Sequence, residues 1–587
     1  MKPSVVTRLL VPSVVTRLLV PSVVTRLLVP SVVTRLLVPS VVTLLLILAP
    51  VSFAQDLRAI AFTDVADLLP EAAFVTNSPG TPPSSVTDGG VGQLPGWPVT
   101  IGTVFNFKPT RGAVLADLNR DNRLEIIVAS TEGRVYAWDY LGNALPGFPA
   151  QTGNMAQYAP AVGDIDGDGW LEIVQNVRGL TTGGGLYVID HLGQFKPGFP
   201  ITGKYFSSSP CVVDLDGDGK LEIVAGERLG SIGYVHIYRW DGTEWGGNWP
   251  RVLDHVPAMS PGVADVNRDG APDIMIASYN SIHVWNRDGA LLPGWPKQIA
   301  SANFSYQSAV FADLDRDGYR EIVVGAHRDA AGCYVFRHDG TLYPGWPQLL
   351  GTWTYCPPTV TDLEGDGQLE ILDGRAGYLS GGSACFWAWD THGNIKPGFP
   401  YFSSHGGGSE GPLTVADIDG DGRMEIFADH NMMQSSQGWL FGVDANGQDL
   451  PGFPLRPIGF TYMNGATIGD VNNDGHYELA VLSYSDYTLD VNLYTLPTQY
   501  RRTARDWLTY RGQNKRTGAY PVALPGDLNC DGRVDFDDIN PFVLALSDPQ
   551  AYQAAYPGCN ILNGDCNGDG QVNFDDINPF VALLTGP

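Results

Sequence analysis

Positively charged residues are scarce in this sequence. Its 587 residues include 36 Lys and Arg against 63 Asp and Glu, which gives a formal net charge of −27 at neutral pH. Proteins that bind nucleic acid carry basic patches that complement the phosphate backbone. The charge balance therefore excludes nucleic acid as a partner, and it raises the question of where the carboxylates lie.

Familiar catalytic motifs are also missing. The sequence contains no G-x-S-x-G, no H-E-x-x-H, no phosphate-binding P-loop and no dinucleotide fingerprint. None of the seven cysteines forms a C-x-x-C pair, so a zinc ribbon is not expected. Four cysteines lie in or beside expected strands and are predicted to be buried free thiols: Cys211, Cys333, Cys356 and Cys385. Near the C-terminus, Cys559 could pair with Cys566, but the sequence leaves the connectivity open.

The N-terminus repeats the nonapeptide PSVVTRLLV over residues 3–42 and then becomes apolar. Several basic residues precede nineteen uncharged residues, Leu36 to Ala54, which end in small side chains. This order is typical of a secretory signal, here residues 1–54 with cleavage before Gln55. The alternative is an uncleaved membrane anchor, because nineteen residues nearly span a bilayer. We expect a secreted, extracellular or cell-surface protein with no stable membrane insertion after cleavage.

One pattern recurs eight times after this leader, at spacings of 47 to 55 residues. An apolar run is followed by an acidic loop, D-x-[DNE]-x-D-[GN]-x-x-[ED], then by a second apolar run, an aromatic run and PG[FW]P. The runs alternate or are rich in β-branched and aromatic residues, as strands are. Units of about 50 residues with four strands each are typical of an all-β protein, an eight-bladed β-propeller.

Two alternatives remain at this point, a seven-bladed propeller with one irregular unit and a superhelical β-solenoid. A segment LPGWP at residues 94–98 precedes the first acidic loop, and no such segment follows the eighth. If this segment supplies the outer strand of the last blade, the ring closes with few free strand edges. The Trp and Phe of PG[FW]P recur at one structural position, which predicts that they pack between blades and do not stack on sugar.

The acidic loops predict calcium sites. Side-chain oxygens at positions 1, 3, 5 and 9 and the carbonyl of position 7 suit Ca²⁺, which takes six to eight oxygen ligands. Glycine at position 6 permits the sharp turn, and the Asn at this position in the first loop tolerates the same conformation. Without a cation, four carboxylates so close together would repel one another strongly.

The predicted propeller ligands are Asp117, Asn119, Asp121 and Glu125; Asp164, Asp166, Asp168 and Glu172; Asp214, Asp216, Asp218 and Glu222; Asp265, Asn267, Asp269 and Asp273; Asp313, Asp315, Asp317 and Glu321; Asp362, Glu364, Asp366 and Glu370; Asp417, Asp419, Asp421 and Glu425; Asp470, Asn472, Asp474 and Glu478. The first, fourth and eighth loops carry Asn at position 3 and so have one carboxylate fewer. We expect these three to be the weakest sites.

Residues 94–518 resemble the FG-GAP or VCBS-type repeats, the calcium-loop propellers also found in integrin alpha subunits. The resemblance rests on the eight D-x-D-x-D-G-x-x-E loops, and the stretch WLTYRGQNKRTG at 507–518 resembles the end of such arrays. It implies the fold and the metal. The family includes adhesins, lectin-like binders and a few enzymes, so the resemblance implies no single activity.

A different repeat follows a short linker at 519–525. GDLNCDGRVDFDDINPFVLAL and GDCNGDGQVNFDDINPFVALL are near copies, each a twelve-position EF-hand-like loop that enters a helix. The predicted ligands are Asp527, Asn529, Asp531, the carbonyl of Arg533, Asp535 and Asp538 in the first loop, and Asp565, Asn567, Asp569, the carbonyl of Gln571, Asn573 and Asp576 in the second. A module this small has little core, so calcium is expected to supply folding energy.

The tandem pair, residues 526–587, resembles a type I dockerin. That family implies docking onto a cohesin-like extracellular partner, often in a polysaccharide-degrading system. Positions 10 and 11 of the loops are Phe-Asp, where many cohesin binders have small hydroxyl residues, and the 38-residue spacing of the two copies is long for the family. A calcium-stabilised C-terminal cap or sorting module is the alternative.

Residues that break the repeat are the candidates for ligand binding. Most of them lie at the ends of the expected second strands, on one rim of the ring, and the others flank a Gly-rich stretch nearby: Arg178, Arg228, His327, Arg375, His405, Glu410, Asp429 and His430. Two functions are compatible with this pattern. The first is a non-enzymatic secreted protein that binds a glycan or a protein, as in carbohydrate binding or cell adhesion. The second is a carbohydrate-active enzyme of polysaccharide catabolism, a lyase or a glycoside hydrolase. The regularity of the eight units favours the first.

Overall fold

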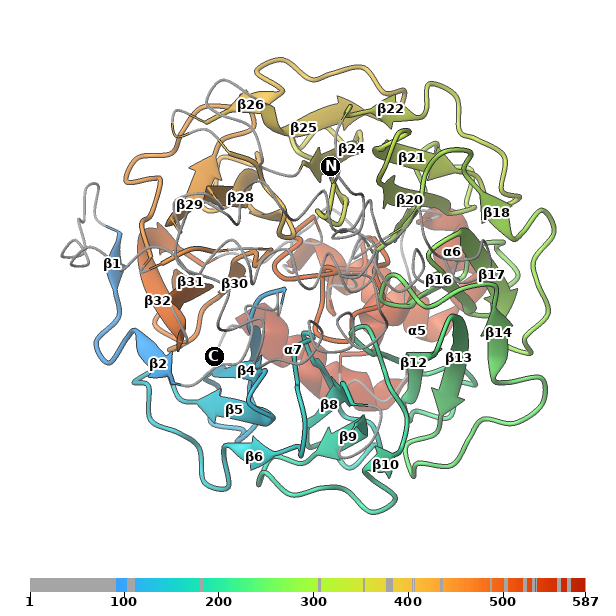
Figure 1. The fold of residues 1–587 in the computed structure, drawn as a ribbon, viewed down its shortest axis with the longest axis horizontal. Helices are drawn as coiled ribbons and strands as arrows, with labels where there is room; N and C mark the ends of the chain where they lie inside the picture. Colours follow the sequence, from blue (N-terminus) through green and yellow to red (C-terminus); the bar gives the residue numbers. More distant parts are fainter. Residues whose placement is uncertain are drawn as a thin grey trace, which may run out of the picture. The chain divides into compact units, whose positions relative to one another are not determined.

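Eight small antiparallel sheets contain the strands of the computed structural model and form its blades (Figure 1). The structure describes residues 91–102, 111–179, 184–304, 308–351, 354–375, 384–403, 405, 407–432, 437–457, 459–461, 463–485, 488–500, 505–520, 525–529, 534, 536–556, 561–566 and 572–585, all within one compact unit of residues 67–587. Each sheet corresponds to one sequence repeat. The predicted eight-bladed β-propeller is therefore confirmed, and the seven-bladed and solenoid alternatives are wrong.

The blades are numbered here in chain order. Blade 1 comprises β3 (Val114–Ala116), β4 (Glu125–Ser130), β5 (Arg134–Trp138) and β6 (Ala150–Gln151). Blade 2 comprises β7 (Ala161–Gly163), β8 (Glu172–Val177), β9 (Gly185–Ile189) and β10 (Ile201–Thr202). Blade 3 comprises β11 (Cys211–Val213), β12 (Glu222–Leu229), β13 (Ile232–Tyr238) and β14 (Arg251–Leu253). Blade 4 comprises β15 (Gly262–Ala264), β16 (Asp273–Ala277), β17 (Ser281–Asn286) and β18 (Lys297–Gln298).

The second half of the ring repeats this pattern. Blade 5 comprises β19 (Val310–Ala312), β20 (Glu321–Ala326), β21 (Gly332–Phe336) and β22 (Gln348–Leu349). Blade 6 comprises β23 (Thr359–Thr361), β24 (Glu370–Gly374), β25 (Ala384–Asp390) and β26 (Tyr401–Phe402). Blade 7 comprises β27 (Thr414–Ala416), β28 (Glu425–Met432) and β29 (Gln437–Val443). Blade 8 comprises β30 (Thr467–Gly469), β31 (His476–Ser485) and β32 (Thr488–Gln499), joined by β1 (Gly92–Gln93) and β2 (Val99–Ile101).

The N-terminal strands close the ring. Both β1 and β2 pair antiparallel with β32, with Gly92 opposite Thr495 and Val99 opposite Val491. The segment LPGWP lies between these two strands, so the prediction that it completes the last blade is confirmed. This pairing covers the outer edge of β32, which would otherwise offer unpaired backbone groups.

The aromatic residues of PG[FW]P pack between blades, as predicted. Trp97, Phe148, Phe199, Trp249, Trp295, Trp346 and Phe399 are each less than 10% exposed. The indole N–H groups reach the following blade: Trp249 donates to the carbonyl of Arg287 at 2.7 Å and Trp295 to that of His338 at 2.9 Å. The motif therefore links neighbouring blades by apolar contact and by hydrogen bonds.

Residues 505–520, which we call the axial segment, contact the first strand of every blade. The first strands of neighbouring blades touch one another, for example β3 with β7 and with β30. The axial segment binds these strands through backbone and side-chain hydrogen bonds to Leu115, Val162, Val212, Val263, Phe311, Thr361, Val415 and Ile468. It therefore occupies the centre of the ring, where the inner strand edges would otherwise lack partners.

Three short helices form the C-terminal module: α5 (Ile539–Ser547), α6 (Pro549–Ala555) and α7 (Ile577–Thr585). Short 3₁₀ turns, η1 (Phe536–Asp538), η2 (Ile561–Gly564) and η3 (Phe574–Asp576), flank them. Phe542 and Phe580 stack with ring centroids 4.1 Å apart in its small apolar core. In the described part of the chain, no helix is long and apolar enough to span a bilayer.

Candidate functional site

Each acidic loop joins the first strand of a blade to the second, so all eight loops lie on one face of the ring. Their hydrogen bonding is the same in every blade. The Asp at position 1 accepts from the N–H of position 6 at 2.7–3.0 Å. The acid at position 9 accepts from the N–H of position 2 at 2.7–3.0 Å. These bonds hold the carboxylates in one fixed arrangement.

Two positions of the loop adopt the left-handed backbone conformation. Position 6 does so throughout, including Asn122 with φ of 64°, as expected from the sequence. Position 4 does so as well, although it is Arg in three loops and Asn in another: φ is 60° at Arg120, 59° at Arg268, 61° at Arg316 and 57° at Asn473. Sequence analysis missed this requirement. The glycines at position 4 of the other four loops carried the signal.

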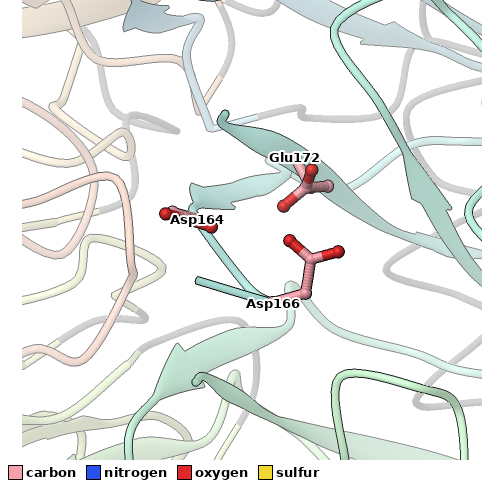
Figure 2. A group of neighbouring side chains, drawn as sticks. All are labelled: Asp164, Asp166 and Glu172. Carbon is pink, nitrogen blue, oxygen red and sulfur yellow. The ribbon is translucent and has the colours of Figure 1, made fainter. Parts of the chain in front are cut away.

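The carboxylates of a loop converge on one point. Four loops bring three carboxylate oxygens within 4.8 Å of one another: Asp164, Asp166 and Glu172; Asp214, Asp216 and Asp218; Asp313, Asp315 and Glu321; Asp417, Asp419 and Glu425. Figure 2 shows the first of these groups, between β7 and β8. They belong to blades 2, 3, 5 and 7, which carry a full set of Asp and Glu. The Asn-containing loops of blades 1, 4 and 8 are not among these groups, and neither is the loop of blade 6, although it also carries a full set.

Burial raises the pKa of the acid at position 9 in all eight loops. The pKa reaches about 7 for Glu125, Glu172, Glu222, Asp273, Glu370 and Glu478 and about 8 for Glu321 and Glu425. Neighbouring carboxylates raise these pKa values further in most of the loops, for example Asp216 acting on Glu222. With such a pKa a carboxyl is partly protonated at neutral pH, and a nearby cation would favour its ionised form.

The second oxygen of the position 9 acid tests whether the loops fit a metal. Glu222 Oε1, Asp273 Oδ1 and Glu478 Oε1 are buried and have no hydrogen-bond partner among the described residues. A buried carboxylate oxygen without a partner is costly. Its position beside further carboxylates suits a hard cation, and the residues therefore fit calcium.

The C-terminal loops show part of the same arrangement. Oδ1 of the buried Asp538 accepts from the N–H groups of Leu528 and Asn529 at 2.8 and 3.0 Å. In the second copy, Asp576 accepts from the N–H of Asn573 at 2.8 Å. Six of the predicted ligands lie outside the described residues: Asp531, Arg533, Asp535, Asn567, Asp569 and Gln571.

The opposite rim carries arginine side chains over aromatic rings. Arg178 and Arg228, from neighbouring blades, both lie over Tyr205, at 5.4 and 5.9 Å from its centroid. Arg375 lies over Trp387 at 6.0 Å. The structure thus brings together two of the predicted ligand-binding residues around an aromatic ring that the sequence did not single out. Three of the predicted arginines are half-buried here.

The cluster around Asp429 is closed. Glu410 and Asp429 are 0% exposed and His430 is 1% exposed. Asp429 Oδ1 accepts from Ser409 Oγ and from the N–H groups of Glu410 and Gly411, at 3.1, 3.0 and 2.6 Å. His405 and His430 both contact Trp439, with centroids at 4.6 and 6.0 Å. The structure brings these predicted residues together at blade 7, where Asp429 fixes a turn and where His405, unlike the other three, is exposed. His327 is also buried, in blade 5.

Acid is expected to destabilise the protein through His430. Burial, with a further contribution from His405, lowers the pKa of His430 to about 3. Between pH 3 and 6.5 the unfolded chain binds a proton at this residue and the folded chain does not. The free energy of unfolding therefore falls as the pH is lowered through this range. Between pH 7 and pH 5, the free energy of unfolding should fall by about 2 kcal/mol more in wild type than in His430→Gln. Denaturant titrations at both pH values measure this, with His392→Gln at an exposed site as control. Parallel losses in wild type and His430→Gln would contradict it.

The four predicted thiols, at Cys211, Cys333, Cys356 and Cys385, are buried and form no disulfide among the described cysteines, as expected. Cys566 is also free among the described cysteines, and its proposed partner Cys559 lies outside the described residues.

Comparison with known proteins supports the repeat. Residues 117–174, 214–276 and 265–324 match the model of the FG-GAP-like repeat. No curated protein matches this chain. Among solved structures, the chain is similar to the exotype rhamnogalacturonan lyase YesX (16% identity, 70% of this chain and 75% of that one, TM-score 0.46). It is also similar to the V. cholerae biofilm matrix protein Bap1 (14%, 77% and 95%, TM-score 0.35) and the quinohemoprotein alcohol dehydrogenase of Comamonas testosteroni (11%, 70% and 77%, TM-score 0.45). The chain therefore contains FG-GAP-like repeats that form an eight-bladed β-propeller.

Proposed function

We propose that this chain is a secreted calcium-binding protein whose propeller binds a glycan or protein ligand and whose C-terminal module attaches it to an extracellular partner. The observation that carries the calcium proposal is the hydrogen bonding shared by all eight loops, which leaves a buried oxygen of the position 9 acid unpaired in blades 3, 4 and 8. A bound Ca²⁺ would supply positive charge at these carboxylates and so hold them ionised.

The proposed domain boundaries are those predicted from the sequence. Residues 1–54 are the signal, 55–93 an N-terminal segment, 94–518 the propeller, 519–525 a linker and 526–587 a dockerin-like module. More than half of the 63 acidic residues are then ligands of ten calcium sites. The leader, which lies outside the described residues, carries the proposal of secretion.

The rim opposite the calcium loops is the proposed ligand surface. Guanidinium groups over aromatic rings offer several hydrogen-bond donors beside an apolar face, a combination that suits sugars and carboxylates. Because the axial segment fills the centre of the ring, we place the ligand on the rim and not in a central channel. The buried, hydrogen-bonded state of Asp429 favours binding over catalysis at this rim.

A polysaccharide panel tests this surface. Purified protein is screened against neutral and uronate-containing polysaccharides, and both binding and product release are measured. We expect binding without product release, and weaker binding by Arg228→Ala, whose side chain lies at the rim. Lys515→Ala, at an exposed residue of the axial segment, is the control. Product release that Arg228→Ala reduces would instead establish the enzymatic alternative, and no binding to any polysaccharide would leave a protein ligand as the remaining form of the proposal.

The C-terminal module carries two similar exposed apolar patches. Phe536 is 71% exposed and Phe574 is 78% exposed, and each precedes a helix with an exposed Ile in its first position, Ile539 or Ile577. Exposed apolar residues repeated in this way mark interaction surfaces. We propose that they bind a cohesin-like protein. Binding to a cohesin panel should persist when one Phe is changed to Ser and be lost when both are changed.

A further inference from the structure

Two acidic loops contain a lysine side chain that comes from another part of the same blade. In blade 2, Nζ of Lys196 lies 2.6 Å from Asp166 Oδ2 and 3.1 Å from Glu172 Oε1. In blade 6, Nζ of Lys396 pairs with Glu364 and lies 3.0 Å from Glu370 Oε1. Both ammonium groups are largely buried, with 15% and 17% of the side chain exposed.

The residue that corresponds to Lys196 and Lys396 makes the same backbone hydrogen bond in the other blades up to blade 7. This residue precedes PG in most copies, and its N–H donates to the third strand at 2.9–3.0 Å in blades 1 to 7. The residues concerned are Leu145, Lys196, Trp245, Leu292, Tyr343, Lys396 and Leu450. Only the side chain differs between these blades, so the choice of lysine changes the charge of the loop and leaves its fold unchanged.

The lysines donate to the second carboxylate oxygen of the position 9 acid, which has no hydrogen-bond partner in three other blades. In blades 3, 4 and 8 the second oxygen of the position 9 acid has no hydrogen-bond partner in the described part of the chain. In blades 2 and 6 the same oxygen, of Glu172 or Glu370, accepts from the lysine ammonium. In both loops the ammonium also pairs with the position 3 acid, so it lies where these carboxylates converge.

We propose that Lys196 and Lys396 are internal counter-ions that compete with calcium, so that blades 2 and 6 bind Ca²⁺ more weakly than blade 7, whose fully acidic loop has Leu450 at the lysine position. This inference rests on the proposed calcium binding. It separates blades 2 and 6 from a loop with the same number of carboxylates, because a bound Ca²⁺ must first displace a positive group from Asp166 and Glu172, or from Glu364 and Glu370. It also means that these two loops keep one positive charge among their four carboxylates when calcium is scarce.

Leucine substitutions supply a matched test, because leucine occupies this position in blades 1, 4 and 7. Calcium binding to the full-length protein is measured by competition with a chromogenic chelator, for wild type and for a Lys196→Leu and Lys396→Leu double variant. We expect the double variant to gain two sites in the tight class, at least tenfold stronger than the corresponding sites of wild type. The reverse variant, Leu450→Lys in blade 7, should lose one tight site.

Melting temperatures give a second readout. In excess chelator the double variant should melt below wild type, because its loops have lost their counter-ions, and in saturating calcium it should melt at or above wild type. If wild type, the double variant and Leu450→Lys all bind calcium equally, the proposal that the lysines compete with calcium is wrong. The proposal that the loops bind calcium would still stand. An absence of calcium binding in wild type and variants alike would overturn both.

Discussion

Arg516→Ala is expected to lower the free energy of unfolding by about 3–5 kcal/mol, because it leaves buried acceptors unpaired and opens a cavity. Arg516 is 0% exposed. Its guanidinium donates to the carbonyl of Pro160 in blade 2 at 3.0 Å, to Thr509 Oγ1 at 3.0 Å and to the carbonyl of Tyr510. Arg516 therefore links residues within the axial segment and also links the segment to the inner edge of blade 2.

The neighbouring residue is the control. Lys515 is exposed, and its contribution to the ring is a backbone carbonyl that accepts from Val212 at 3.0 Å. Lys515→Ala keeps that bond, and its effect should stay within about 0.5 kcal/mol. Denaturant and thermal unfolding of the two variants compare them directly. Equal midpoints would show that the Arg516 side chain does not stabilise the propeller.

Trp97→Ala is expected to cost about 3–5 kcal/mol, because it removes the side chain that links the first and last blades. Trp97 is 7% exposed and lies next to the β2 strand of blade 8. Its indole N–H donates to the carbonyl of Tyr140 in blade 1 at 2.8 Å, and its ring packs edge-on against Trp138 at 6.3 Å. Loss of these contacts weakens the junction between blade 8 and blade 1.

Phenylalanine is the matched substitution here, because Phe148 and Phe199 fill the same position in other blades. Trp97→Phe keeps most of the apolar contact and should cost less than about 1.5 kcal/mol. Thermal and denaturant unfolding should show lower midpoints for Trp97→Ala than for Trp97→Phe. Equal midpoints of the two variants would contradict a role for this side chain in ring closure.

Features that repeat along the chain could be predicted from the sequence. The eight loops, the blade number, the closing role of LPGWP and the packing of its tryptophan all follow from local patterns that recur. The acidic groups that we propose to bind calcium could be predicted in the same way, because the spacing of Asp and Glu within nine residues already determines which oxygens converge.

Features that depend on contacts between distant residues were not predicted. Lys196 is 24 residues from Glu172, and only the fold shows that its ammonium enters the acidic loop. Asp429 was predicted to bind ligand, but it holds the turn at residues 409–411. The stretch at 507–518 was recognised as the end of the array, yet its place at the centre of the ring follows from hydrogen bonds to strands hundreds of residues away, such as that from Asn514 to Leu115.

Thermal unfolding in saturating calcium and in excess chelator tests the central claim most directly. A ligand at one hundred times its dissociation constant stabilises the folded state by about 2.7 kcal/mol per site, and several loops should contribute together. We expect the melting temperature to fall by about 10 °C or more when calcium is removed. Magnesium at the same concentration is the control for ionic strength, because its smaller ion prefers octahedral sites with several waters. A melting temperature that is the same in calcium and in chelator would contradict the account.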